Sequence, residues 1–113
     1  MAFKQGVKPC VVVPKKLHRL LRGDLFALGY KPHVGPRSKR GGEIQAWVAP
    51  LGSNRQIHVQ EERLEDGDIA VFAHTEPAGY GLRHMLAAVF DRASFAGGGK
   101  ALRNDLRSRG WDV

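Results

Sequence analysis

Residues 55–75 read RQIHVQEERLEDGDIAVFAHT, and this stretch decides the fold. Apolar and polar residues alternate on both sides of Glu65-Asp66-Gly67, which is the pattern of two antiparallel strands joined by a tight turn. A two-residue loop would place the apolar residues of the two strands on opposing faces. A three-residue loop, with Gly67 in the left-handed conformation, places them on one face: Ile57, Val59, Ile69, Val71 and Ala73.

A further strand is predicted just before this hairpin, starting at Glu43 and ending before the turn at Pro50, because apolar and polar residues alternate there as well. A four-residue loop over residues 50–53 would bring its apolar residues, Ile44, Ala46 and Val48, to the same face as those of the hairpin. The hairpin register itself sets His58 opposite His74. The other face of the three strands would then carry Gln45, Trp47, Gln56, His58, Gln60, Phe72 and His74.

Helices are predicted on both sides of the strands. Residues 15–28 carry leucines at spacings of three and four and are followed by Gly29 as a C-cap, with Gly23 as a point where the helix can divide. Residues 82–90 have the apolar pattern of a core-facing helix, which the glycines at 97–99 are expected to end. A short basic helix is predicted over residues 100–109, with Gly110 as its cap and Trp111 packing back.

The predicted fold is therefore α+β, in the order α-β-β-β-α-α. It has a three-stranded antiparallel meander with helices packed on one face, and Val11–Val13 is a candidate fourth strand at the edge. The 113 residues are expected to form one domain, 1–113, with an exposed basic loop over residues 31–42. Cys10 is the only cysteine, so an internal disulfide is excluded and a reducing, cytoplasmic location is expected. No cofactor or metal motif is present, so neither is expected.

Charge is concentrated at the two ends of the sequence. Lys and Arg number 18 against 11 Asp and Glu, a net charge of +7, and residues 1–42 carry ten basic residues against one acidic residue, Asp24. The segment from residue 43 to 76 reverses the balance, with two Arg against seven acids. Clustered positive charge favours association with a polyanion. The apolar runs of the sequence, Val11–Val13 among them, are far too short to span a membrane, so no membrane partner is expected.

A nucleic-acid-binding surface is the leading functional hypothesis, with RNA or DNA as the partner and phosphate contacts as the main interaction. The Walker pattern is absent, and two interpretations of the glycines at 97–99 before Lys100 stay open. They would present helix N-terminal amides to phosphate, or they would be a flexible linker before an amphipathic helix with Leu102 and Leu106 facing inward. No catalytic residue is assigned. The predicted contacts come from the first helix, the 31–42 loop and the last helix: Lys15, Lys16, Arg19, Arg22, Lys31, Arg37, Lys39, Arg40, Lys100, Arg103 and Arg107.

Three further hypotheses stay open at this point. A stacking face for unpaired bases is predicted from Trp47, His58, Phe72 and His74, against the alternative that other parts of the chain cover these side chains. A protein-binding module, either an inhibitor or an assembly subunit, would dock its basic face on an acidic protein surface. A small ribonuclease would use His58 and His74 as an acid and base pair across a scissile phosphate.

The order of elements from about Lys15 to Arg109 resembles double-stranded-RNA-binding domains and the HicA family of small toxin ribonucleases. The first resemblance implies a Gly-rich turn that leads into a phosphate-gripping helix, and Gly97-Gly98-Gly99-Lys100 is similar to it in order. The second implies a Gly-Ser-His segment at the start of the sheet, where this chain has Gly41-Gly42-Glu43-Ile44 and lacks the catalytic histidine. The chain is assigned to neither family.

Overall fold

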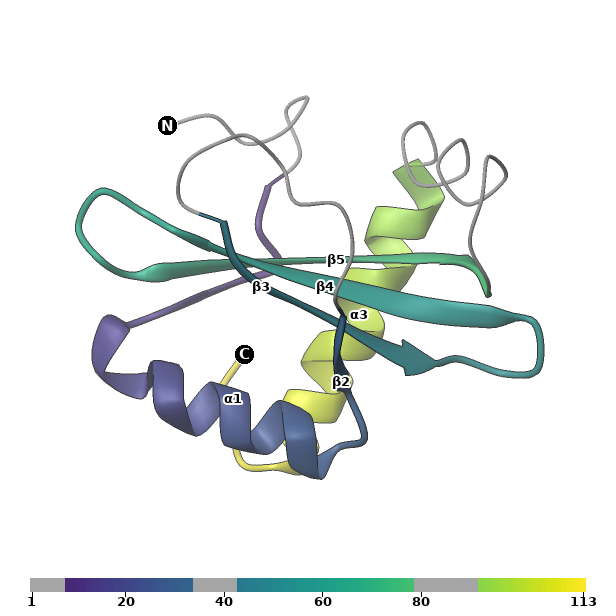
Figure 1. Ribbon diagram of the computed structural model, residues 1–113, viewed down its shortest axis with the longest axis horizontal. Coiled ribbons are helices and arrows are strands. Elements are labelled where there is room, and N and C mark those ends of the chain that lie inside the picture. Colours follow the sequence, from purple (N-terminus) through teal and green to yellow (C-terminus); the bar gives the residue numbers. More distant parts are fainter. Residues whose placement is uncertain (1–7, 34–42, 79–91) are drawn as a thin grey trace.

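The architecture is a five-stranded antiparallel sheet with two helices, seen in a computed structural model that describes residues 8–33, 43–78 and 92–113 (Figure 1). The strands lie in the order β1-β5-β4-β3-β2, which corrects the predicted three- or four-stranded meander and the predicted element order. They are β1 (Val11–Val13), β2 (Lys31–His33), β3 (Glu43–Pro50), β4 (Arg55–Arg63) and β5 (Ile69–Pro77). No helix within these described ranges is long and apolar enough to cross a membrane.

The hairpin of β4 and β5 has the predicted register. Val59 pairs with Ala73 and His58 with His74, and the Leu64 amide donates to the Asp68 carbonyl across the turn. Gly67 has a φ of 92°, the left-handed conformation that a three-residue loop requires. The edge position of β1 is also as predicted, because Val11–Val13 pair with β5 at one side of the sheet.

The register of β3 was predicted wrongly. Pro50 pairs with Gln56 and Trp47 pairs with Val59, so the turn is centred on residues 52–54, with Gly52 at a φ of 76°. A shift of the pairing register by an odd number of residues moves every side chain of a strand to the opposite face of the sheet. Trp47 therefore lies among the core residues, 3% exposed, and burial of its large apolar ring stabilises this register more than burial of Ala46 would.

The first helix was located correctly. It begins with the 3-10 turn η2 (Lys15–Leu17), continues as α1 (His18–Ala27) through Gly23 without a break, and ends before Gly29. Leu21 and Leu25 are fully buried, whereas Leu20 is 55% exposed and does not join the core.

The C-terminal helix α3 spans Arg92–Ser108 and runs straight through the three glycines that were expected to separate two helices. A Cβ atom on Gly98 would lie 2.5 Å from the Cα of His74, so glycine is needed here for the helix backbone to touch β5. Leu102 and Leu106 are buried. Trp111 packs back against the core, as predicted, and its amide donates to the Leu106 carbonyl. The helix predicted over 82–90 lies outside the described residues.

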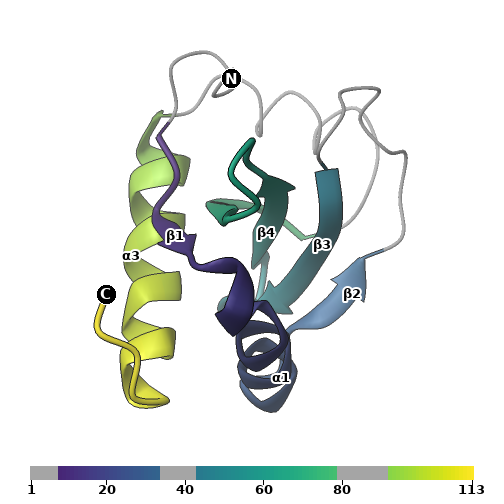
Figure 2. The ribbon, with the colours of Figure 1, turned by 90° about the vertical axis from the view of Figure 1, so that its left-hand side faces the viewer.

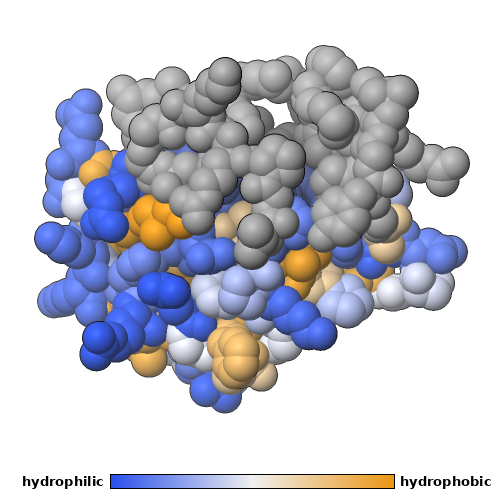
Figure 3. Space-filling view, viewed as in Figure 1, coloured by the Kyte–Doolittle hydropathy of each residue, from blue (hydrophilic) through white to orange (hydrophobic). Residues whose placement is uncertain are grey.

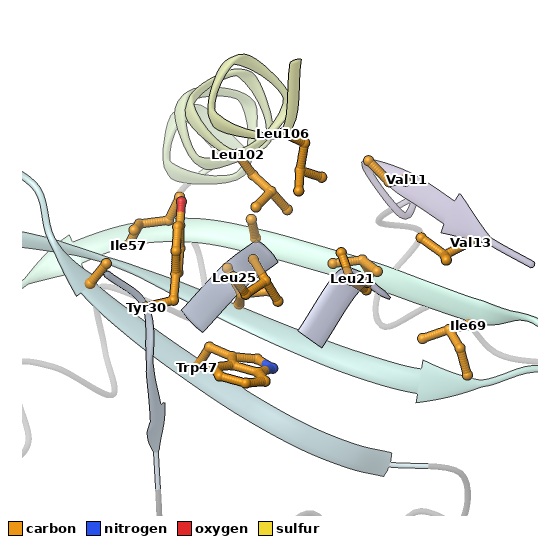
Figure 4. Packing of buried hydrophobic residues seen from close by; sticks show 14 residues of the cluster. Val11, Val13, Leu21, Leu25, Tyr30, Trp47, Ile57, Ile69, Leu102 and Leu106 are labelled. Atoms are coloured by element: carbon orange, nitrogen blue, oxygen red, sulfur yellow. The ribbon is translucent and has the colours of Figure 1, made fainter. Parts of the chain in front are cut away.

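The core lies between one face of the sheet and both helices (Figure 2). Figure 4 shows Leu102 and Leu106 of α3 pointing toward the sheet, with Leu21 and Leu25 of α1 beside them. Tyr30 closes the cluster near the end of α1, and its hydroxyl donates a 2.8 Å hydrogen bond to Asp105. Burial, that hydrogen bond and the nearby carboxylate all raise the pKa of Tyr30. The opposite face of the sheet is thus free of contact with α1 and α3.

Candidate functional site

Four polar side chains meet on the sheet face opposite the helices. His58 is directly across from His74 on the neighbouring strand, and Gln56 is directly across from Glu76. Residues two apart on a strand point to the same face, and residues opposite each other on adjacent strands have Cβ atoms roughly 5 Å apart. The backbone alone therefore brings these four side chains together, without help from a loop.

The four side chains converge on the carboxylate of Glu76. The Nε2 atom of His74 lies 2.6 Å from Oε1 of Glu76, and the Nε2 of Gln56 donates to Oε2, also at 2.6 Å. The Nδ1 atom of His58 is 3.8 Å from the same Oε1. The rings of His58 and His74 meet edge to face, with centroids 5.0 Å apart, and His33 of β2 adds a third imidazole whose centroid is 5.3 Å from that of His58.

Burial sets the electrostatics of this cluster. The side chain of Glu76 is fully buried, whereas those of His58 and His74 are 18% and 14% exposed. Burial acts to raise the pKa of Glu76, but the hydrogen bonds from His74 and Gln56 and the charges of both imidazoles outweigh it and lower the pKa. The cluster thus holds a carboxylate anion beneath two imidazoles.

This arrangement is better suited to hold a cation than to cleave RNA. A ribonuclease pair needs two imidazoles that face a negatively charged phosphate from both sides. Here the carboxylate of Glu76 lies between His58 and His74, where its charge would repel a phosphate. The cross-strand pairing of the two histidines is confirmed, while the ribonuclease hypothesis stays a prediction.

A second fully buried carboxylate, Glu61, lies on the helix side of β4. One of its oxygens contacts the imidazole of His18 from α1, and the other accepts a hydrogen bond from the indole N–H of Trp47. These two donors come from different elements, so Glu61 links α1 to β3 through the core. We interpret this group as a structural one.

The predicted stacking face does not form as a unit. Trp47 is buried in the core on the opposite face from His58 and His74, and Phe72 is 9% exposed. The error follows from the register of β3, because the shift that buries Trp47 removes it from the polar face. His58 and His74 do lie on that face, side by side.

The cationic residues of the first helix form an exposed group, here named the α1 patch: Lys15, Lys16, Arg19 and Arg22. Their side chains pair with no carboxylate among the described residues. At 100° per residue, Arg19 and Arg22 lie about 140° and 160° around the helix from Asp24. Asp24 accepts hydrogen bonds from Arg109 and Trp111, beyond the end of α3, so both arginines point away from α3.

The cationic residues of the last helix form a separate group, the α3 patch: Lys100, Arg103 and Arg107. On α3 they lie about 140° to 160° around the helix from Asp105, the residue that contacts Tyr30. They too face away from the neighbouring helix, so the two patches are not one continuous surface. The glycines at 97–99 are inside α3, so the free amides expected there for phosphate binding are not present at this position.

The remaining predicted contacts are placed only in part. Lys31 is exposed at the start of β2, whereas Arg37, Lys39 and Arg40 lie outside the described residues.

Cys10 is partly buried before β1 and its thiol donates to the Val71 carbonyl, while burial raises its pKa to about 11.

The hydrogen bond from Gln56 to Glu76 was not predicted from the sequence, and neither were the buried clusters around Glu76 and Glu61. The signal for Glu76 was present, because His74-Thr75-Glu76 on a strand places a histidine and a carboxylate on the same face. Glu61 gave no such signal, since its partners are distant in sequence.

Comparisons with known proteins do not add a family to this geometry. No family model, no curated protein and no solved structure matches the chain. The function must therefore be argued from the residues themselves.

Proposed function

We propose that this protein binds nucleic acid, RNA or DNA, through phosphate contacts made chiefly by the α1 patch. The observation that supports this proposal is a run of four exposed cationic side chains on two successive turns, with no carboxylate partner among the described residues. Lysines and arginines that are not engaged by carboxylates are available to phosphates. In the α3 patch, Lys100 is exposed and can supply a further phosphate contact on another side of the molecule, whereas Arg107 already donates hydrogen bonds to the Val113 carbonyl and to Asn104.

Of the two acids near the α1 patch, Asp24 is engaged elsewhere, whereas Asp68 lies at the border of the patch. Asp24 pairs with Arg109, with the Nη2 of the arginine 3.1 Å from Oδ1. Asp68, at the turn of the β4–β5 hairpin, accepts a hydrogen bond from the backbone amide of Lys15 and lines an open surface hollow with Lys15 and Lys16. The acidic turn therefore borders the patch at its Lys15 end, and Arg19 and Arg22 lie farther along the helix.

The surface around α1 also suits contacts with an extended polar ligand. Figure 3 shows mainly hydrophilic residues in the lower half of the view, where α1 lies, interrupted by isolated hydrophobic patches. One exposed aromatic residue, Phe26, is 70% exposed and follows Arg19 and Arg22 on the same side of the helix. A ring at this position can stack on a base while the arginines hold phosphates.

Fluorescence anisotropy with a labelled 20-mer, single-stranded or duplex, tests the proposal across a salt series. We expect micromolar or weaker affinity that falls steeply with salt. The double variant Arg19→Gln/Arg22→Gln should bind several-fold more weakly and reduce the slope of log K against log salt by about 2, because each lost phosphate contact removes nearly one unit.

The matched control is Arg55→Gln/Arg63→Gln, which removes the same charge from the two exposed arginines of β4. If this control weakens binding as much as the α1 variant, then net charge alone is responsible and the α1 patch is not the site. Salt-insensitive binding, or none, would reject the proposal itself.

A protein partner with an acidic surface is the second candidate. The observation in its favour is that Leu20 and Phe26, 55% and 70% exposed, lie among the cations of α1 and would be covered in a protein interface. The ratio of absorbance at 260 and 280 nm of the purified protein, before and after a high-salt wash, separates the two. Bound nucleic acid favours the first candidate, and a co-purifying acidic protein the second.

A further inference from the structure

We propose that His58, His74 and Glu76 bind a divalent transition-metal ion, for which Zn²⁺ is the probe. This site is on the sheet face opposite the helices, so it is independent of the proposed nucleic-acid contacts. The donor set is two imidazoles and one carboxylate, the combination found in catalytic zinc sites and in non-haem iron sites.

The geometry is close to that of a ligand shell. One ligand atom from each of the three residues lies within 4.8 Å of the other two. Ligands at about 2.1 Å from a tetrahedral metal lie roughly 3.4 Å from one another. The observed separations from Oε1 of Glu76, 2.6 Å to His74 and 3.8 Å to His58, bracket that value, so small side-chain rotations are sufficient.

The scaffold holds these ligands in a fixed arrangement. All three come from two central, hydrogen-bonded strands, β4 and β5, rather than from loops. Gln56 donates to the second carboxylate oxygen of Glu76, a contact that orients a ligating carboxylate. Gly98 of α3 is packed against the backbone of β5 behind His74, which limits movement of that strand.

The charge of the cluster also favours a cation. A metal ion that replaces the protons on the two rings would offset the charge of the buried carboxylate. Three protein ligands leave at least one coordination position for water or a substrate. His33 is beside His58 and is a further imidazole close to the metal position.

The contact between His18 and Glu61 provides a matched comparison within the same chain. It also joins an imidazole to a fully buried carboxylate, but its third member is the indole of Trp47, which donates a hydrogen bond and cannot ligate a metal. A metal-binding signal that depended only on a histidine next to a glutamate would arise there as well.

Competition with a chromophoric zinc chelator, on tag-free full-length protein, tests the site. We expect one Zn²⁺ per chain, with affinity that falls as the pH is lowered because the ligands must lose protons. His58→Asn, His74→Asn and Glu76→Gln should each weaken binding by roughly 100-fold or more, at least the loss seen when supporting residues of a metal site are removed. His18→Asn should leave the affinity unchanged.

Two further readouts keep the test decisive if a variant folds poorly. Zn²⁺ should raise the melting temperature of the wild-type protein and of His18→Asn. It should not raise that of His58→Asn, His74→Asn or Glu76→Gln, the three triad variants. Co²⁺ should give a visible ligand-field absorption that the triad variants lose. Absence of binding by the wild type, or binding that all three triad variants retain, would overturn the proposal.

Discussion

Glu61 and Glu76 are both fully buried glutamates next to a histidine, yet they lie on opposite faces of the sheet and differ in what surrounds them. Glu61 has one donor for each oxygen, and those donors come from α1 and β3. Within the part of the chain that the structure describes, the donors to Glu76 come from β4 and β5, and a second imidazole lies within 4 Å. One carboxylate therefore joins separate elements, while the other is the centre of a cluster of potential ligands.

The comparison teaches that burial of a charge does not by itself identify a functional site. What differs is the chemistry of the partners, because an indole N–H can only donate a hydrogen bond and an imidazole can also bind a metal. The following changes test that distinction.

The largest effect is expected from Gly98→Ala, which acts on the strand that carries His74 and Glu76. The new methyl group would lie 2.5 to 2.8 Å from backbone atoms of Ala73 and His74, which cannot rotate away. We expect a loss of about 3 kcal/mol or more in the free energy of unfolding, measured by urea denaturation, and weaker Zn²⁺ binding.

Gly97→Ala is the control for this change. Among the described residues its methyl group would meet Thr75 alone, at 3.8 Å, and alanine is the better helix former, so we expect a gain of up to about 1 kcal/mol. Equal effects of the two substitutions would show that α3 does not rest on β5 as described.

The next effect contrasts Glu61→Gln with Glu76→Gln. The first places an amide NH₂ against one of two donors, and Trp47 at 3% exposure has little access to water as a replacement partner. We expect a loss of about 2 to 3 kcal/mol for Glu61→Gln, from urea denaturation without metal. For Glu76→Gln we expect about 1 kcal/mol under the same conditions, because the imidazole of His74 can accept a hydrogen bond as well as donate one and so can pair with the new amide. The reverse order would mean that Glu76, and not Glu61, is the structural carboxylate.

The smallest effect concerns pH. The pKa of Glu76 is lowered from its ordinary value of 4.5, so the unfolded chain binds more protons than the folded chain as the pH falls past that value. The stabilisation is present above pH 4.5 and is lost as the pH drops through the lowered pKa. The stability difference between wild type and Glu76→Gln should therefore shrink as the pH falls below 4.5, and a constant difference would contradict the assignment.

Much of the central fold could be predicted from the sequence, because local chemistry determines it. Gly67 in a three-residue loop determines the register of β4 and β5, and therefore the pairing of His58 with His74. Leucine spacing in residues 15–28 and the apolar run Val11–Val13 likewise indicated the first helix and the edge strand.

The errors arose where distant contacts overrule a local pattern. Which side chains of β3 point to the core depends on where Trp47 can be buried. The helix α3 continues through three glycines because β5 packs against a helix surface that has no side chain at position 98. The cationic residues were found, but their division into an α1 patch and an α3 patch depends on Asp24 and Asp105, whose partners lie far away in sequence.

The contact of Gly98 with the backbone of β5 also sets a sequence requirement that can be recognised in other proteins. Glycine at 98 and leucines at 102 and 106 form one stripe at intervals of four, and the strand against which they rest carries His74 and Glu76. The glycine sets how closely the helix approaches the strand, whereas His74 and Glu76 serve the other face of the same strand. A sequence with His-x-Glu about two dozen residues before Gly-xxx-Leu-xxx-Leu would meet both requirements, close helix packing on one face and metal ligands on the other.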